Sequence, residues 1–171
     1  MNVLDVVKLR RSVRAFVGKR IGDEKIKALK EALIWAPSAG NLQSRKFYFV
    51  FDEDLRSKFE KAAGGQQFLR EAPLVIVCCT DKKITRRYGD RGWELYAIQD
   101  VSASIENLLL VACDLGLATC WVGAFNEETI HSLLKLPETL RPISLIPVGY
   151  PAEEPELPKH LPESHIIETI A

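Results

Sequence analysis

The segment that most constrains the fold is a long run with helical periodicity, about residues 93–115. Apolar side chains recur in it every three to four residues, the spacing of one buried helix face. The members of this face are Ile98, Val101, Ile105, Leu108, Leu109 and Ala112. Small residues such as Ala103 and Ser104 allow another helix to approach closely, and Gly116 is suited to follow the last turn. We therefore expect a long helix that packs along one side.

Shorter apolar segments lie on both sides of this helix in the sequence. Their patterns predict strands over 47–51, 74–80, 118–122 and 143–149, and helices over 3–10, 53–62 and 127–135. Another helix is expected to begin with Asp23 as its N-cap and to end before Pro37. Residues 37–45 and the charged residues 81–92 are expected to be loops.

The composition is that of one ordinary globular domain. The chain has 171 residues, of which 47% are hydrophobic and 27% charged, and its 23 basic and 23 acidic residues cancel. A zero net charge argues against a nucleic-acid binder. No apolar run approaches the ~20 residues that span a bilayer. Since residues 1–5 lack the features of a secretory signal, we expect a cytoplasmic protein with no membrane partner.

Cysteine and histidine spacing gives no sign of a metal site. The cysteines are Cys78, Cys79, Cys113 and Cys120, without a Cys-x-x-Cys motif, and the histidines are His131, His160 and His165. We expect four reduced cysteines in the core, with Cys78 and Cys79 on opposite faces of a strand, and no metal ligands.

The C-terminal residues differ from the rest in composition. Four prolines fall between residues 151 and 162, which favours an extended path, and residues 166–170 are strand-like. We therefore divide the chain into a domain over 1–150 and an arm over 151–171. The arm is expected to dock on a sheet edge, for example that of a partner subunit, and the alternative is a frayed terminus.

Three clusters could bind a ligand. Residues 10–14 combine three arginines with Ser12 and could hold a phosphate, although a solvated basic turn is the simpler interpretation. Residues 37–43 form a turn of small and amide-bearing residues, and residues 120–125 carry a strand into a glycine-containing turn. Each of the last two could equally be an ordinary connection.

No motif for protein-based catalysis is present. The sequence lacks a nucleophile elbow, a phosphate-binding P-loop and the Gly-x-Gly-x-x-Gly fingerprint. We therefore predict no catalytic side chain, and a cofactor is the best explanation for any enzymatic activity.

Taken in order, six segments resemble the FMN-dependent nitroreductase family. They read RRSVRAF (10–16), APSAGNLQ (36–43), EAPLVIV (71–77), QDVSASIENLLL (99–110), LGLATCWVG (115–123) and PVGYP (147–151). The resemblance implies a three-layer α/β (α+β) fold, in which helices flank a mixed, mostly antiparallel sheet. It also implies a homodimer that exchanges C-terminal strands, with the long helix in the interface and two FMN molecules between the subunits.

The resemblance also assigns roles to residues around the FMN phosphate. Arg10 and Ser12 would bind the phosphate, and Arg11 would lie near the phosphate and the ribityl chain. Lys159 would reach the same phosphate from the arm. His160 stands where a second basic residue is frequent, and it would either bind the phosphate when protonated or remain in solvent.

Further positions correspond to the flavin ring. Arg14 would face the N1–O2 side, where a cation stabilises the reduced flavin. Gln67, together with Gln66, would meet the pyrimidine edge, and the amides of Gly123 and Ala124 would lie near N5. The partner subunit would cover the flavin with the residues Pro37, Ser38, Ala39 and Asn41.

The implied activity is two-electron transfer from NADH or NADPH to a nitroaromatic, a quinone or a similar electron-poor small molecule, by a ping-pong mechanism. The alternatives are a specialised member, such as a dehalogenase or a flavin-modifying enzyme, and a non-catalytic flavin-binding dimer.

Two segments depart from the family pattern. Ser44 and Arg45 replace a frequent Pro-Trp pair, which puts the packing beside the cofactor in doubt. Residues 81–97 are shorter than the helical segment that often covers the substrate pocket. Their aromatic residues Tyr88, Trp93 and Tyr96 would form either a reduced lid or, as we prefer, part of the core and interface.

Overall fold

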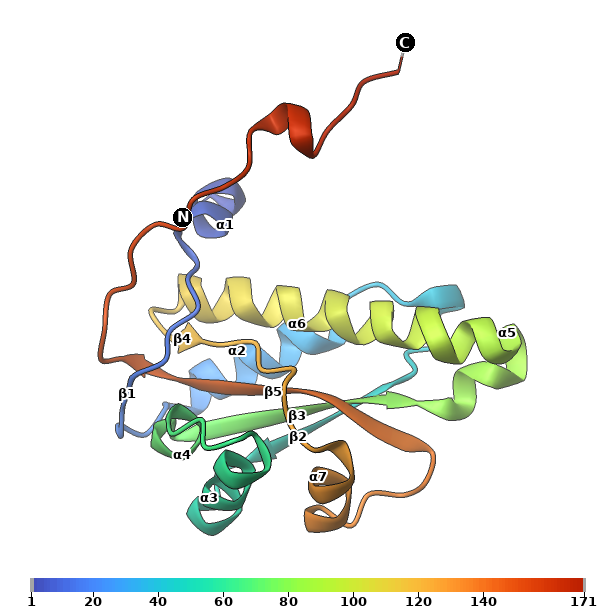
Figure 1. Ribbon diagram of the computed structural model, residues 1–171, viewed down its shortest axis with the longest axis horizontal. Coiled ribbons are helices and arrows are strands. Elements are labelled where there is room, and N and C mark those ends of the chain that lie inside the picture. The colour runs from blue at the N-terminus through green and yellow to red at the C-terminus, as the bar shows by residue number, and fades with distance from the viewer. Residues whose placement is uncertain (1, 171) are drawn as a thin grey trace.

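A computed structural model describes residues 2–170. The chain forms three layers, a central sheet with helices on both of its faces (Figure 1). The strands are β1 (Phe16–Val17), β2 (Arg45–Val50), β3 (Leu74–Asp81), β4 (Ala118–Thr119) and β5 (Leu140–Pro151). The helices are α1 (Val3–Leu9), α2 (Asp23–Ile34), α3 (Glu53–Ala62), α4 (Phe68–Glu71), α5 (Thr85–Arg91), α6 (Ala97–Asp114) and α7 (Glu127–Leu133). Short 3-10 turns lie at Ala39–Asn41, Lys82–Ile84 and Glu163–His165, and a π-helical turn lies at Gly92–Tyr96.

The sheet has the order β1-β5-β3-β2, with β4 also paired to β5, and every pair of these strands is antiparallel. Parallel pairing occurs at an isolated bridge between Ser12 and Thr119, which makes the sheet mixed. The expected three-layer fold with a mostly antiparallel sheet is confirmed.

Strand β3 forms the centre of the core because both of its faces are covered. Side chains alternate along a strand, so Val75, Val77 and Cys79 face the layer of α3, α4 and α7. Leu74, Ile76 and Cys78 face the layer of α2 and α6. The opposite orientation of Cys78 and Cys79 is therefore confirmed. All four cysteines are free thiols, but Cys113 is half-buried rather than in the core.

Gly149 permits a close approach at the end of β5. A Cβ atom at this position would lie 2.7 Å from Cδ of Pro73 and 3.0 Å from a ring carbon of Phe16. Glycine is therefore required for β1 and the start of β3 to pack against β5.

Several local predictions are corrected by the structure. Residues 81–92 are mainly helical rather than a loop, and the π-helical turn joins α5 to α6. The strand expected over 118–122 is only two residues long, and Val122 then pairs with Leu145 of β5 as an isolated bridge, so the pairing with β5 is interrupted between Thr119 and Val122. Gly22 is the N-cap of α2, and Asp23 is its first helical residue. The elements β1 and α4 are too short to leave a periodic pattern and were not predicted.

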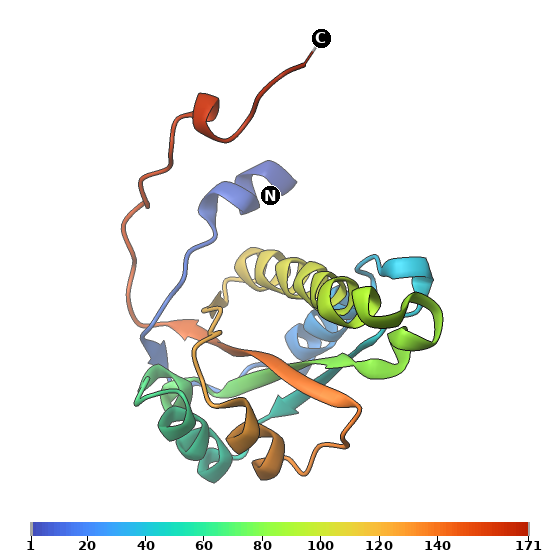
Figure 2. The ribbon, with the colours of Figure 1, turned by 45° about the vertical axis from the view of Figure 1, so that its right-hand side comes forward.

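The arm leaves the body after β5 and runs past α1 into solvent (Figures 1 and 2). Its residues 166–170 form no strand in the single chain, and Ile166, Ile167 and Ile170 are 66%, 61% and 92% exposed. Helix α1 also exposes apolar side chains, among them Val3 and Leu4. These two segments leave apolar surface without a partner in the single chain.

No helix within residues 2–170 is long and apolar enough to cross a membrane. The same residues contain no group of three or more His, Cys, Asp or Glu side chains placed to hold a metal ion.

Candidate functional site

The basic turn of residues 10–14 lies beside β4. The amide of Val13 donates to the carbonyl of Thr119 at 3.0 Å, next to the bridge between Ser12 and Thr119. This pairing follows from the sequence, since Val13 is the apolar residue of the turn and is buried in the core. The buried Val13 leaves the side chains of Ser12 and Arg14 exposed on either side of it.

Arg10 and Arg11 line a cavity of about 290 Å³ at the end of α6. The opposite walls include Gly116, Cys113 and the start of the arm. The Arg11 guanidinium donates to the carbonyls of Lys8 at 2.6 Å and Arg10 at 2.8 Å, which holds it at the C-terminal end of α1. Burial raises the pKa of the Cys113 thiol, and the charges of Arg10 and Arg11 oppose that rise.

Two carboxylates share this cavity. Glu153 and Glu154 line it, and an oxygen of Glu153 accepts a 2.5 Å hydrogen bond from the Arg14 amide. Burial also raises the pKa of Cys120, an effect that Arg14 opposes and Glu153 reinforces. Glu153 therefore contributes a negative charge to a site with a cluster of cations, a feature that the sequence analysis missed.

The turn after β4 brings together two further predicted positions. The side-chain amide of Gln66 donates to the carbonyls of Ala63 at 2.9 Å and Ala124 at 3.2 Å. Within residues 2–170, the amides of Gly123 and Ala124 donate to no hydrogen-bond acceptor, and both residues are exposed. Gln67 is exposed at the start of α4. The turn thus offers two backbone donors beside a fixed amide side chain.

Arg45 holds the start of the loop of residues 37–43 through hydrogen bonds to backbone carbonyls. Its guanidinium donates to the carbonyls of Ile34 at 3.0 Å, Ala36 at 2.7 Å, Pro37 at 2.9 Å and Asp100 at 3.3 Å. Burial lowers the pKa of Arg45, and the charge of Asp100 opposes that change. The residue that departs from the family pattern is therefore what orders the end of α2 and the loop after it.

Asp100 fixes the same loop from α6. Its Oδ1 accepts from the amide of Ala39 at 2.8 Å, whereas its buried Oδ2 has no hydrogen-bond partner within residues 2–170. Burial raises the pKa of Asp100, and the Ala39 amide and Arg45 oppose that rise. Asp100 lies in one of the segments that resemble the family, but no periodicity or spacing in the sequence indicates that it holds this loop.

A second cavity, of about 500 Å³, lies above this loop. Its lining consists of Pro37, Ser38, Ala39, Tyr88, Tyr96, Gln99, Asp100 and Ala103. Helix α5 packs on the loop at Gly40, where a Cβ atom would lie 2.5 Å from Oη of Tyr88. Asn41 is exposed and has a φ of 55°. Three of the four predicted cover residues therefore line this cavity, together with two aromatic residues from the short segment 81–97.

The two groups of predicted residues lie at opposite ends of α6. Asp100 contacts the loop near the start of the helix. Cys113, near the end of the helix, lines the 290 Å³ cavity of Arg10 and Arg11, which we call the arginine cavity. Thirteen residues of α-helix span about 20 Å. One chain therefore does not bring residues 37–41 and residues 10–14 to the same site.

Lys159 and His160 are not brought to the arginines of their own chain. Both are exposed on the arm, which projects away from the body, and neither makes a hydrogen bond or ion pair within residues 2–170 (Figure 2).

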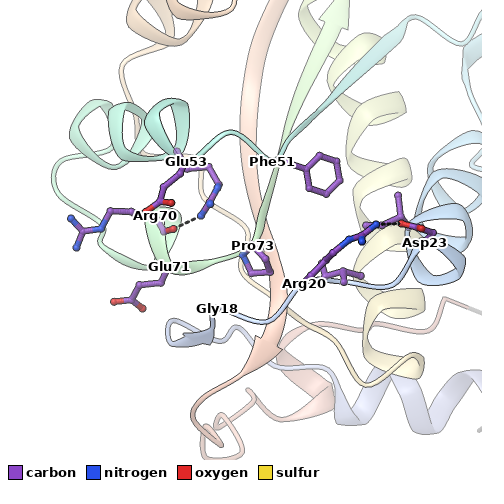
Figure 3. A pocket seen from close by; sticks show the side chains of 11 residues that line it. Gly18, Arg20, Asp23, Phe51, Glu53, Arg70, Glu71 and Pro73 are labelled. Atoms are coloured by element: carbon purple, nitrogen blue, oxygen red, sulfur yellow. Dashed lines mark hydrogen bonds and ion pairs between the residues drawn. The ribbon is translucent and has the colours of Figure 1, made fainter.

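A third cavity, of about 820 Å³, contains none of the predicted residues. In Figure 3, Arg20 and Asp23 lie on one side of Pro73 and Arg70 and Glu71 on the other. The charges there are largely matched, because Arg20 pairs with Asp23 at 2.8 Å and Arg70 with Glu60 at 3.5 Å. The buried guanidinium of Arg56 donates to the carbonyls of Arg70 and Ala72 and so closes the end of α4.

Comparisons with known proteins agree with the fold. A model of the Nitroreductase family matches residues 7–67 and 59–150. A protein of Archaeoglobus fulgidus, provisionally named NADH dehydrogenase/NAD(P)H nitroreductase, is 36% identical over 155 residues, which cover 88% of this chain and 86% of that protein. An FMN reductase of Bacillus subtilis that uses NAD(P)H is 26% identical over 173 residues, covering 91% of this chain and 68% of that protein.

A solved structure supports the same assignment. The crystal structure of a protein from Parabacteroides distasonis, with the same provisional name as the archaeal protein, has a TM-score of 0.86 and 28% identity. The match covers 100% of this chain and 99% of that chain. Because the family model matches most of its length, this chain belongs to the nitroreductase family.

Proposed function

We propose that the protein is an FMN-dependent oxidoreductase that passes two electrons from NADH or NADPH to a small electron-poor acceptor such as a nitroaromatic or a quinone. The observation that carries the proposal is the basic turn, in which Ser12 bridges Thr119 of β4 while Arg10 and Arg11 line the cavity beside it. The chain then continues from β4 to the unpaired amides of Gly123 and Ala124. Its relatives include proteins named FMN reductase, NADPH-flavin oxidoreductase and nitroreductase.

The residues of the arginine cavity fit a phosphate. A phosphate monoester carries up to two negative charges and accepts several hydrogen bonds, and guanidinium and hydroxyl groups supply matching donors. Arg10 and Ser12 would hold the phosphate, and Arg11 would lie beside it. Glu153 opposes this fit, so it must turn away from the phosphate when FMN binds.

The turn at residues 123–124 fits the polar edge of a flat ring. Its two amides would donate to heteroatoms of the flavin, and Gln66 and Gln67 would meet the edge that carries both donors and acceptors. Arg14 would place a cation where the reduced ring carries negative charge. FMN, when bound, supplies the hydride-accepting chemistry that the side chains of this protein lack.

The protein's own contribution is orientation and access. Within the lining of the 500 Å³ cavity, Asp100 is the only residue with an ionisable carboxyl group, and it is engaged with the loop amide of Ala39. No side chain is therefore assigned as a general acid or base. Because one open cavity would receive donor and acceptor in turn, we expect ping-pong kinetics.

We also propose that the working unit is a homodimer with FMN between the chains. The loop of residues 37–41 and the turn of residues 10–14 are about 20 Å apart along α6, too far to enclose one ring from a single chain. A second copy would bring its own loop to this chain's arginines. The exposed apolar residues of α1 and the arm are the surface that such a dimer would bury.

The arm would occupy the free edge of β2. Within residues 2–170 this strand pairs with β3 alone. The groove between it and α2 is lined by Leu33, Ile34, Phe47 and Phe49, together with the cationic residues Lys30, Arg45 and Lys46. Ile166, Ile167 and Ile170 of a partner's arm would fill this groove while its backbone extends the sheet. Lys159 and His160 would approach a phosphate only in the docked arm. The cytoplasmic location also stays a prediction.

Stopped-flow spectroscopy tests the activity. The protein is loaded with FMN and mixed without oxygen with NADH or NADPH, and absorbance of the oxidised flavin is followed. We expect bleaching by at least one donor and its reversal by a quinone or a nitroaromatic compound. Flavin that stays oxidised with both donors would support the non-catalytic alternative instead.

A further inference from the structure

Helix α5 carries a group of cations that the proposed function does not use. Its guanidiniums are Arg86, Arg87 and Arg91, and no carboxylate within residues 2–170 lies within 4.0 Å of them. The nearby ion pair between Lys83 and Asp81, at 3.3 Å, involves neither this helix nor its arginines. Asp90 is the one carboxylate of this helix and forms no ion pair with the three arginines, so the helix carries an excess of positive charge.

Two of these arginines are held in place by the aromatic rings of the 500 Å³ cavity. The Arg87 guanidinium lies 5.4 Å from the centre of the Tyr88 ring, and that of Arg91 lies 5.5 Å from the centre of the Tyr96 ring. Arg91 Nε also donates to the Tyr96 hydroxyl at 3.0 Å. The two rings pack edge to face with their centres 5.3 Å apart. Such stacking reduces the entropy that a guanidinium loses when it binds an anion.

Arg87 lies directly over the loop that would cover the flavin. A Cβ atom at Gly40 would lie 3.0 Å from Nη1 of Arg87, so the guanidinium contacts the turn between the residues that line the cavity. The carboxyl group in the lining, Asp100, is buried and turned to the Ala39 amide and to Arg45. It therefore forms no ion pair with Arg87 or Arg91, whose rings Tyr88 and Tyr96 line the cavity.

We propose that Arg87 and Arg91 bind the 2′-phosphate of NADPH and so make NADPH the preferred electron donor. The inference rests on the proposed function and goes beyond it by choosing between the two donors. NADPH differs from NADH only by this phosphate, which brings up to two more negative charges. Guanidinium forks are suited to a phosphate monoester, and an arginine is a usual partner of the 2′-phosphate.

The experiment compares kcat/KM for NADPH and NADH in the FMN-loaded full-length protein. The variants are Arg87→Gln, Arg91→Gln and the double variant. Arg86→Gln is the matched control, because it removes the same charge from the same helix at a residue without a ring contact. We expect the wild-type protein to favour NADPH by more than tenfold. Each single substitution should lower the NADPH:NADH ratio about tenfold, the scale of one hydrogen bond to a charged group, and Arg86→Gln by less than twofold.

A binding measurement adds a readout that is independent of turnover. Adenosine 2′-monophosphate is titrated against the FMN-loaded protein, and it should bind more tightly than adenosine 5′-monophosphate in the wild type but not in the double variant. The flavin content and the thermal unfolding of each variant show whether it has folded. The variant Arg87→Lys keeps the charge and should retain part of the preference for NADPH.

Three results would overturn the inference. They are equal use of both donors by the wild type, an unchanged ratio in the double variant, and equal losses with both donors, which would mean that the arginines bind the pyrophosphate common to both. If neither donor bleaches the flavin, the proposed function fails as well. Bleaching by both donors without preference leaves the proposed function standing and removes only this inference.

Discussion

Single charges decide how well the arginine cavity suits a phosphate. Glu153 lines this cavity and accepts the hydrogen bond from the Arg14 amide, so its carboxylate would repel an incoming phosphate. We predict that Glu153→Gln tightens FMN binding by about 1 kcal/mol, which is about fivefold in Kd, because a like charge is removed and a hydrogen-bond acceptor is kept.

Quenching of FMN fluorescence during titration measures this change. The matched control is Glu156→Gln, which removes a carboxylate of the arm that does not line the cavity. Weaker FMN binding by Glu153→Gln would show that Glu153 supports the site through the Arg14 amide.

The buried carboxyl group of Asp100 should make the stability of the protein depend on pH. Burial raises the pKa of Asp100, so the folded protein takes up this proton at a higher pH than the unfolded chain does. As pH falls through the raised pKa towards about 3.9, the wild type gains stability from this group, whereas Asp100→Asn has no proton to take up. The Tm of the wild type minus that of Asp100→Asn should therefore rise between pH 7 and pH 4.

Thermal unfolding followed by circular dichroism at several pH values gives this difference. A difference that is constant, or that falls as the pH is lowered, would contradict the assigned environment of Asp100.

At the scale of elements, the loop after α2 depends on the side chain of Arg45 for its shape. Four backbone carbonyls accept from this one guanidinium, and three of them lie between Ile34 and Pro37. We predict that Arg45→Met destabilises the protein by about 1–3 kcal/mol, because four carbonyls, those of Ala36 and Asp100 in half-buried hydrogen bonds, lose a charged donor while the apolar stem is retained.

Urea unfolding measures the loss, and hydrogen exchange should show faster exchange of the Ala39 amide. Lys46→Met is the control, since Lys46 is the exposed neighbour on the same strand. Equal effects of the two substitutions would mean that Arg45 does not hold the loop.

Elements with strong periodicity were predictable from the sequence, and those that depend on distant contacts were not. The alternating faces of β3 and most of α6 followed from apolar spacing. Segment 81–92 was misjudged because its charges suggested a solvated loop, whereas its helix is held by Tyr88 and Tyr96 and by contact with Gly40. The roles of Arg45 and Glu153 needed the structure, because their partners are carbonyls and amides that no residue pattern identifies.

At the scale of the whole molecule, the proposed dimer depends on the arm. Exposed apolar residues on residues 157–170 and the free edge of β2 are the two surfaces expected to meet. We predict that removing residues 152–171 leaves a folded body, since the core contains none of them, but shifts the dimer towards monomer by at least tenfold in dissociation constant.

Analytical ultracentrifugation over a range of concentrations measures this shift. The substitution Ile167→Asp in the full-length chain is a second variant that tests the arm without shortening it. An unchanged dimer in both variants would place the interface elsewhere.

The most direct test of the account is the visible spectrum of the full-length protein, saturated with FMN and freed of excess cofactor, measured across a size-exclusion peak. We predict a yellow dimer with one oxidised FMN per chain. A colourless monomer that does not retain FMN would contradict it.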